Sequence, residues 1–289
     1  MKMLIQNYST ALATEALYLH RAMVESECDV VFWADKNIST FDMLDQTRPD
    51  TILTHFRFIS HDMMKYLSGS NIELILNVTG ADNQVINQIE SEFKNKKIKT
   101  PLFFTNTHDI INPGVSGKTK IINLLPALDI FIPKQDLPSF EIDTAFITTE
   151  PTDLLKTLTD NEEVYHIIGI GSDNKEFDFN LDIPNLISVI DRYKKCTIVD
   201  DIIIAFSQLF FECTFRCPRT ILKVPENQKP ALDKVLATLF HIQDSEDISE
   251  AIKSQIKRKH NPFNRAARLL RHLKCDSEAA KVQSFGDKL

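Results

Sequence analysis

The chain has 289 residues, 43% of them hydrophobic, and a chain of this length favours two domains with separate cores. Its formal net charge of −7 argues against a protein that binds nucleic acid over its whole surface. The five cysteines are scattered and form no CxxC pair, so they predict neither a disulfide framework nor a zinc site: Cys28, Cys196, Cys213, Cys217 and Cys275.

The cysteine pattern favours a reducing compartment. Residues 1–7 form an apolar run of strand length that lacks the cleavage site of a signal peptide, and no run of about 18 apolar residues is present for a membrane span. We therefore expect a soluble cytoplasmic protein with no membrane partner.

Short β-rich runs alternate with helical patterns over the first 125 residues. Strands are predicted at residues 3–6, 29–33, 51–55, 73–78, 101–105 and 121–125. Helical spacing of apolar residues occupies residues 10–25, 60–67 and 83–93. Strands that alternate with helices predict a parallel sheet covered on both faces.

The same series begins again in the second half. Residues 133–151 contain three prolines and form the best predicted boundary. Beyond it we predict strands at residues 165–170, 197–199 and 220–224, and helices at residues 183–193, 202–213 and 232–240. The fold class predicted is α/β, with Rossmann-like domains at residues 1–140 and 141–289 that face a central cleft at the carboxyl ends of their strands.

The predicted helix over residues 202–213 carries one carboxylate, Glu212, in an otherwise apolar sequence. An unpaired glutamate costs several kcal/mol to bury, so Glu212 is expected to meet either a ligand or a polar partner. The alternative to a ligand contact is an ordinary crossover helix in which Glu212 forms a local cap or salt bridge.

Glu212 and the return strand that follows it resemble the sugar-nucleotide half of GT-B glycosyltransferases, in which the acid at the matching place holds the donor's ribose hydroxyls. The sequence departs from that pattern because residues 213–217, Cys-Thr-Phe-Arg-Cys, replace the usual small residues. The strand–helix series also resembles spore-maturation-type GT-B proteins. The chain also resembles the T4-like phage enzymes that attach glucose or arabinose to 5-hydroxymethylcytosine in DNA, because it is short, has few glycines and ends in a basic segment.

The resemblance implies a UDP-sugar as co-substrate and no permanently bound cofactor. A divalent metal ion is not expected, although Asp200 and Asp201 would be its nearest ligands. The residues Gly169-Ile-Gly171-Ser172 end the strand predicted as the first of the second half, and the two glycines would let backbone amides approach a diphosphate closely. The donor-side residues predicted beside Glu212 are Gly171, Ser172, Asp200, Asp201, Ser207 and Gln208, although Asp201 is also a candidate helix N-cap.

The first half is expected to bind the acceptor. Polar residues follow its first and third strands and are predicted to contact the acceptor: Asn7, Tyr8, Ser9 and Arg57. An inverting sugar transfer needs a base that takes the proton of the acceptor hydroxyl. The candidates at strand ends are His55, His108 and Asp109, which could equally form turns or caps.

Residues 253–274 contain eight Lys or Arg and no acid. This segment could meet DNA phosphates, which makes double-stranded DNA with 5-hydroxymethylcytosine the favoured acceptor. The predicted phosphate contacts are Lys257, Arg258, Lys259, Arg265 and Arg268. The alternative for this segment is a packing helix with an apolar face. Two other functions stay open: a GT-B glycosyltransferase or nucleotide-sugar epimerase that acts on a surface glycan or small molecule, and a non-catalytic nucleotide-binding module.

Overall fold

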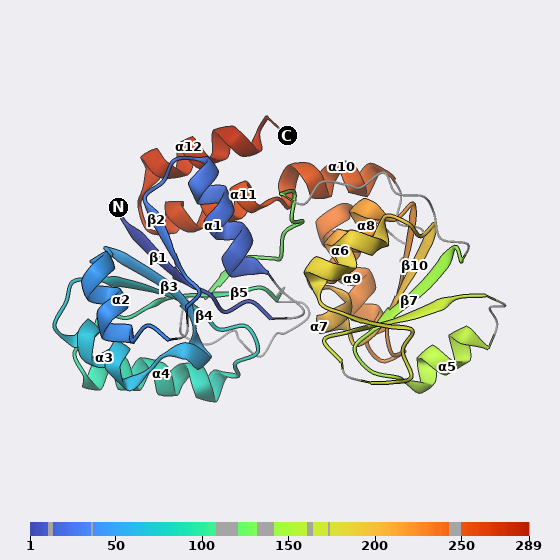
Figure 1. The fold of residues 1–289 in the computed structure, drawn as a ribbon, viewed down its shortest axis with the longest axis horizontal. Coiled ribbons are helices and arrows are strands. Elements are labelled where there is room, and N and C mark those ends of the chain that lie inside the picture. The colour runs from blue at the N-terminus through green and yellow to red at the C-terminus, as the bar shows by residue number, and fades with distance from the viewer. Residues whose placement is uncertain are drawn as a thin grey trace. The chain divides into compact units, whose positions relative to one another are not determined.

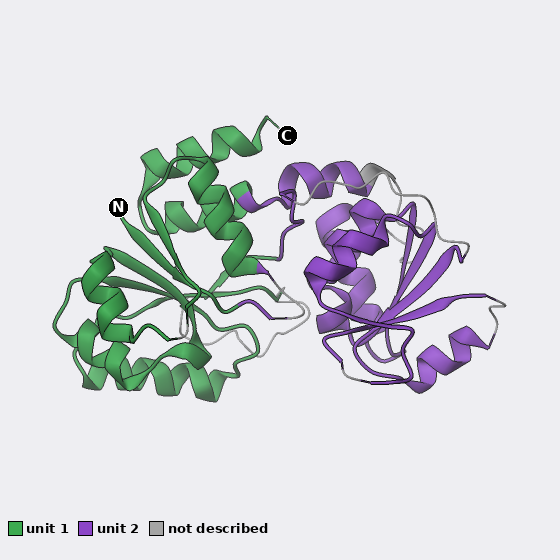
Figure 2. Cartoon of the chain, viewed as in Figure 1, with its two compact units in different colours: residues 1–8, 15–125, 263–288 green, residues 9–14, 126–262, 289 purple. Residues whose placement is uncertain are grey.

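The computed structural model describes residues 1–10, 14–35, 37–107, 121–131, 142–160, 164–172, 174–242 and 250–288. They form two compact units, each built around a parallel sheet (Figures 1 and 2). Unit 1 comprises Met1–Tyr8, Glu15–Leu125 and Phe263–Lys288, and unit 2 comprises Ser9–Thr14 and Pro126–Pro262. The chain therefore returns to the first unit at Phe263, whereas the predicted boundary left its last helices in the second.

The sheet of unit 1 has the six strands predicted for the first half, each within two residues of its expected ends. Their order is β2-β1-β3-β4-β5-β6, and all neighbours are parallel. The bounds are β1 Met3–Gln6, β2 Val30–Trp33, β3 Thr51–His55, β4 Glu73–Asn77, β5 Leu102–Thr105 and β6 Ile121–Asn123.

Helices cover both faces of this sheet. Figure 1 shows α1, α11 and α12 over one face and α2, α3 and α4 over the other. Their bounds, with a short 3-10 turn η1, are α1 Glu15–Glu25, α2 Thr40–Thr47, η1 Phe56–Phe58, α3 His61–Ser68, α4 Asn83–Asn95, α11 Pro262–His272 and α12 Asp276–Gly286. Side-chain caps fix where α2, α3 and α4 begin, since Ser39, Ser60 and Asp82 each accept a hydrogen bond from the first turn.

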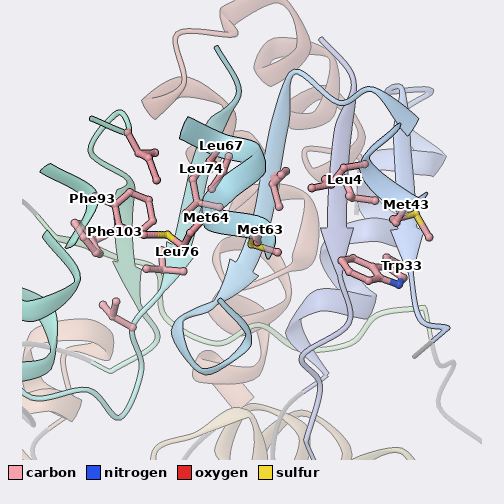
Figure 3. Packing of buried hydrophobic residues seen from close by; sticks show 14 of the residues in the cluster. Leu4, Trp33, Met43, Met63, Met64, Leu67, Leu74, Leu76, Phe93 and Phe103 are labelled. Carbon is pink, nitrogen blue, oxygen red and sulfur yellow. The ribbon is translucent and has the colours of Figure 1, made fainter. Parts of the chain in front are cut away.

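One buried cluster of unit 1 lies between the sheet and α2, α3 and α4. Met63, Met64 and Leu67 of α3 belong to one buried cluster with the strand residues Leu74 and Leu76 (Figure 3). Burial of each such side chain contributes about 1.5–3 kcal/mol. The i, i+1, i+4 spacing of the three α3 residues is what a helix needs to keep one face against a sheet.

The sheet of unit 2 has five parallel strands in the order β11-β10-β7-β8-β9. Their bounds are β7 Thr144–Thr148, β8 His166–Ile170, β9 Phe179–Leu181, β10 Lys195–Val199 and β11 Arg219–Lys223. The middle strand, β7, lies within the stretch that the prolines marked as a boundary, although all five of its residues are buried. Gly171 and Ser172 therefore follow the second strand of this unit, not its first.

Six helices are described in unit 2: α5 Asp153–Thr159, α6 Ile183–Ile190, α7 Ile202–Ala205, α8 Gln208–Arg216, α9 Lys229–Phe240 and α10 Glu250–Lys259. The predicted helix over residues 202–213 is two helices, because Ser207 adopts an extended backbone and caps α8 with its hydroxyl. In β8, Gly169 leaves no room for a side chain unless a neighbour shifts, since a Cβ there would clash with the ring of Phe177.

Each strand order reverses direction once. In unit 1 the chain runs from β1 to β2 on one side and from β3 onward on the other, so the reversal lies between β1 and β3. In unit 2 it lies between β7 and β10. Ligands of doubly wound sheets bind outside the carboxyl ends of the strands at such a switch point.

Among the described residues, no helix is long and apolar enough to cross a membrane.

Candidate active site

The switch point of unit 2 is occupied by a hydrogen-bonded pair, Asp200 after β10 and Thr149 after β7. The backbone N–H and the hydroxyl of Thr149 both donate to Oδ2 of Asp200, at 2.7 Å each. Oδ1 accepts the N–H of Asp201 at 2.9 Å. A carboxylate has about four lone-pair sites, so Asp200 keeps acceptor capacity for a ligand hydroxyl. The sequence does not predict Thr149, because β7 lies within residues 133–151, where the prolines indicate a domain boundary.

Gly171 and Ser172 lie at the end of β8, the next strand along from β7. Gly171 adopts φ +64°, which favours glycine, and its N–H donates to the carbonyl of Leu181 at 2.8 Å. Ser172 accepts the N–H of Asn174 at 3.2 Å. The Gly171 N–H, which was predicted to contact a diphosphate, is therefore hydrogen-bonded to β9. The hydroxyl of Ser172 is half-buried at the end of the strand.

Asp201 and Ser207 are helix N-caps. Oδ1 of Asp201 accepts the N–H groups of Ile203 and Ile204, which is the capping role that was the alternative for this residue. Ser207 accepts the N–H of Leu209 at 3.3 Å. Both side chains satisfy backbone donors at the first turn of a helix.

Gln208 and Glu212 lie one turn apart on α8 and are fully buried. Gln208 accepts the N–H of Thr14 at 2.9 Å and donates to the Thr14 hydroxyl at 3.0 Å. It also donates to Oε1 of Glu212 at 3.3 Å. The α8 helix thereby holds the segment that precedes α1.

Glu212 is enclosed by protein partners. Its Oε1 accepts the N–H of Asp129 at 2.6 Å, and its Oε2 accepts Nε of Arg216 at 3.0 Å. Arg216 is itself buried, donates to the Asp129 carbonyl and lies 3.6 Å from the carboxylate of Asp191. Burial raises the pKa of Glu212 to about 7, and the Arg216 charge opposes that rise.

These contacts correct the expectation that Glu212 faces the donor ribose. A side chain with 0% exposure and partners on both oxygens presents nothing to a ligand in this structure. Glu212 has the alternative role, a local ion pair. A carboxylate in an apolar helix does indicate a polar contact, as the sequence predicted. Its partner is Arg216, four residues further along the same helix.

The switch point of unit 1 also carries polar residues on both of its strands. Thr54 of β3 donates to the side-chain carbonyl of Gln6 on β1 at 2.6 Å. Asn7 is exposed, and its N–H donates to the Trp33 carbonyl. Tyr8 is buried, with its ring centroid 5.9 Å from that of His55. Ser9 is exposed and belongs to unit 2.

His55 ends β3 and uses both of its ring nitrogens. Nδ1 accepts the N–H of Arg57 at 3.3 Å, so Nε2 carries the proton in its 3.2 Å contact with the Thr79 carbonyl. Burial lowers the pKa of His55, which disfavours the charged form of the ring. Neither nitrogen is left to take a proton from an acceptor, so the geometry does not favour His55 as the base. Arg57 is exposed and lies over the ring of Phe56 at 5.5 Å.

A buried carboxylate that the sequence analysis did not select, Glu15, lies at the start of α1. Its Oε2 accepts the hydroxyl of Tyr8 at 2.9 Å and the amides of Asn77 at 2.8 Å and Asn106 at 3.1 Å. Burial raises the pKa of Glu15 to about 7, against these hydrogen bonds and the charge of Arg265. The signal was available, because Glu15 is four residues before the apolar Leu19 and so falls on the buried face of the predicted helix.

The other two candidate bases, His108 and Asp109, lie outside the described residues. Strand β5 ends at Thr105, as the prediction required, and Asn106 directly after it contacts Glu15. In the part of the chain that the structure describes, no group of three or more His, Cys, Asp or Glu side chains is arranged to hold a metal ion.

The basic final segment does not form one helix. It breaks at His260 and Asn261, so that Lys257, Arg258 and Lys259 end α10 in unit 2, whereas Arg265 and Arg268 belong to α11 in unit 1. Arg265 is 5% exposed and donates to the carbonyl of Leu125, so it is a packing residue and not a phosphate contact as predicted. The other four are exposed.

The ion pair on α8 predicts a stability effect for Glu212. We expect Glu212→Ala to lower the free energy of unfolding by about 3–5 kcal/mol, because it leaves Arg216 buried without its nearest partner and Asp129 N–H unbonded. Glu212→Gln keeps one acceptor and should cost less. Urea unfolding of both variants tests this, with Glu27→Ala on the surface as the control that changes little. A Glu212→Ala protein as stable as the parent would contradict the assignment.

Glu15 predicts a pH dependence of stability. Its folded pKa of about 7 exceeds the ordinary value of 4.5, so the folded state binds more protons between these two values and loses stability as pH rises through that window. One such group changes stability by at most about 1.4 kcal/mol per pH unit. Glu15→Gln should flatten the decline between pH 5 and 7 in urea titrations. An unchanged slope would show that Glu15 does not titrate there.

Comparison with protein-family models finds no match, and comparison with curated proteins finds none either. Among solved structures, the chain is similar to the glycosyltransferase SnogD from Streptomyces nogalater, with a TM-score of 0.51 and 11% identity over 94% of this chain and 98% of that one. The glycotransferase of kitacinnamycin matches with a TM-score of 0.48 and 11% identity, over 99% of this chain and 97% of that one. SsfS6, a glycosyltransferase from Streptomyces sp. SF2575, matches at 0.45 and 11%, over 99% and 98%.

At this identity the similarity concerns the fold. SnogD aligns over almost the full length of both chains, and the two parallel Rossmann-like sheets of this chain, with six and five strands, match GT-B glycosyltransferase structures. The chain has the α/β GT-B fold that the sequence predicted.

Proposed function

We propose that this protein is a glycosyltransferase that takes a sugar from a nucleotide-sugar donor, with a UDP-sugar as the first candidate. The observation that carries the proposal is the pair formed by Asp200 and Thr149 at the switch point of unit 2. Asp200 keeps acceptor capacity where doubly wound sheets bind nucleotides, and a ribose hydroxyl is the donor that suits a carboxylate.

We infer that the two units have different tasks. The hydroxyls of Thr149 and Ser172 lie at the ends of neighbouring strands in unit 2 and would accompany Asp200 in holding the donor. Unit 1 would hold the acceptor at its own switch point, beside Tyr8 and His55. The reaction forms a bond between an acceptor oxygen and the anomeric carbon and breaks the bond from that carbon to the diphosphate, so positioning accounts for much of the catalysis.

The surface of unit 1 favours a small acceptor with an apolar part. His55 is surrounded by aromatic rings, with centroid separations of 4.6 Å to Phe56 and 6.4 Å to Phe58. Phe58 is 42% exposed, so part of this aromatic surface is open to solvent. Such a surface suits stacking against a flat or apolar molecule that carries a hydroxyl.

DNA with 5-hydroxymethylcytosine is less well supported as the acceptor. Arg265 is a packing residue, and the four exposed basic residues are divided between two helices of different units. The contiguous basic helix that favoured phosphate contacts is therefore not what the chain forms. A small molecule or glycan is the acceptor class that we favour.

The donor assignment predicts that nucleoside diphosphates stabilise the protein. At 100 times Kd, a ligand that binds only the folded state adds about 2.7 kcal/mol, and thermal melting with UDP, TDP, GDP and ADP would detect this. Asp200→Asn should weaken UDP binding at least tenfold, whereas Glu212→Gln should leave the affinity unchanged. If no nucleotide raises the melting temperature, the proposal fails. Binding without release of UDP from any UDP-sugar would favour the non-catalytic module.

The acceptor assignment predicts weak, non-specific DNA binding at most. We expect a duplex containing 5-hydroxymethylcytosine to bind no more tightly than an unmodified duplex at 50 or 200 mM salt. The triple variant Lys257→Gln, Lys259→Gln and Arg268→Gln should not change UDP release. Tight binding to the modified duplex, with a salt dependence that the triple variant flattens, would restore DNA as the acceptor.

A further inference from the structure

Glu15 lies where three strands of unit 1 end. Its three hydrogen-bond donors are Tyr8, two residues beyond β1, Asn77, the last residue of β4, and Asn106, directly after β5. The carboxylate is therefore at the carboxyl edge of the sheet, where ligands of this fold class bind. It also begins α1, whose N-terminus favours negative charge.

The two oxygens of this carboxylate differ sharply. Oε2 receives all three hydrogen bonds, whereas Oε1 is buried and has no hydrogen-bond partner among the described residues. A buried carboxylate oxygen without a donor is costly, and the side chain of Glu15 is only 1% exposed. Such an oxygen is explained if it receives a donor from a ligand.

The surroundings hold this side chain in place. The side-chain carbonyl of Asn77 accepts the N–H of Thr79, and the Thr79 hydroxyl accepts the N–H of Asn106, so both amides are oriented by a third residue. Oε2 is thus fixed, which fixes the direction of Oε1. The charged and titratable groups that act on Glu15 are Tyr8 and Arg265, and Arg265 is anchored to the Leu125 carbonyl.

We propose that Glu15 is the general base of the reaction and that its Oε1 takes the proton of the acceptor hydroxyl. This inference rests on the proposed function. The acceptor oxygen forms its bond to the anomeric carbon as its proton passes to Oε1, the bond from that carbon to the diphosphate oxygen breaks, and the diphosphate leaves with the electron pair. Glu15 then returns the proton to solvent.

Two observations support this assignment over His55. Both ring nitrogens of His55 are occupied, as described above, while Glu15 has an unoccupied basic atom. In addition, burial raises the pKa of Glu15 to about 7, and a base is most effective when its pKa lies near the working pH. Tyr8, Asn77 and Asn106 are positioning residues, because they orient Glu15 through Oε2.

The test uses release of UDP from UDP-glucose and from UDP-arabinose, with water as the acceptor. For the parent we expect kcat to rise between pH 6 and pH 8 with a midpoint near 7. Glu15→Gln should lower kcat roughly 10²- to 10⁴-fold, as expected for loss of a general base, and should leave the Kd for UDP within about twofold. Glu15→Ala removes the whole carboxylate, and added formate should restore part of its activity.

Glu212→Gln is the matched control, since it makes the same chemical change at the other buried glutamate and should keep the parent's pH profile. Melting temperatures and UDP affinities confirm that each variant is folded. If the parent neither binds UDP nor releases it from either sugar nucleotide, the proposed function fails. If the parent is active and folded Glu15→Gln is equally active, or if formate does not restore Glu15→Ala, the role of Glu15 is overturned while the proposed function stands.

Discussion

The buried ion pair between Glu212 and Arg216 belongs to a polar network on α8 that holds two segments of unit 2, each next to a point where the chain crosses into or out of unit 1. It fixes Asp129, close to the point where the chain leaves unit 1 at Leu125. One turn earlier on the same helix, Gln208 holds Thr14, the residue before the chain enters unit 1 again at Glu15. Charged and polar groups without exposure must find partners, so these contacts specify where each connecting segment lies.

Buried polar contacts also hold the residues of unit 1 that adjoin these two crossings. Arg265 of α11 binds the carbonyl of Leu125, the last residue of unit 1 before the crossing. Glu15, the first residue after the earlier crossing, gathers three donors from strand ends. In each unit, buried polar contacts therefore hold the residues at which the chain crosses to the other unit. In unit 1 these hydrogen bonds hold Oε2 of Glu15, whose other oxygen, Oε1, is the atom that we propose as the base.

The sequence predicted strands well where apolar runs are bounded by polar turns, as at β1, β3 and β10. It failed at β7, because the prolines that flank a fully buried strand are also the mark of a linker. Without β7 the switch point of unit 2 could not be located, and Thr149 was missed. Glu212 shows a second limit: composition marks a buried carboxylate, but only packing shows whether its partner is a ligand or Arg216.

The basic segment shows the same limit at longer range. Eight cations with no acid predict a charged surface, yet Arg265 is buried because the helix presents it toward Leu125. The break at His260 and Asn261 divides the remaining charges between two helices. Residue counts cannot detect such a division, since it depends on which unit each helix packs against.

The central claim is that the donor nucleotide binds at the switch point between β7 and β10. Hydrogen exchange of the protein with and without UDP tests it most directly, because amide protection reports the bound surface peptide by peptide. The account predicts new protection in the peptides that contain residues 148–150, 171–172 and 200–202. UDP-dependent protection confined to unit 1, with none in these peptides, would contradict it.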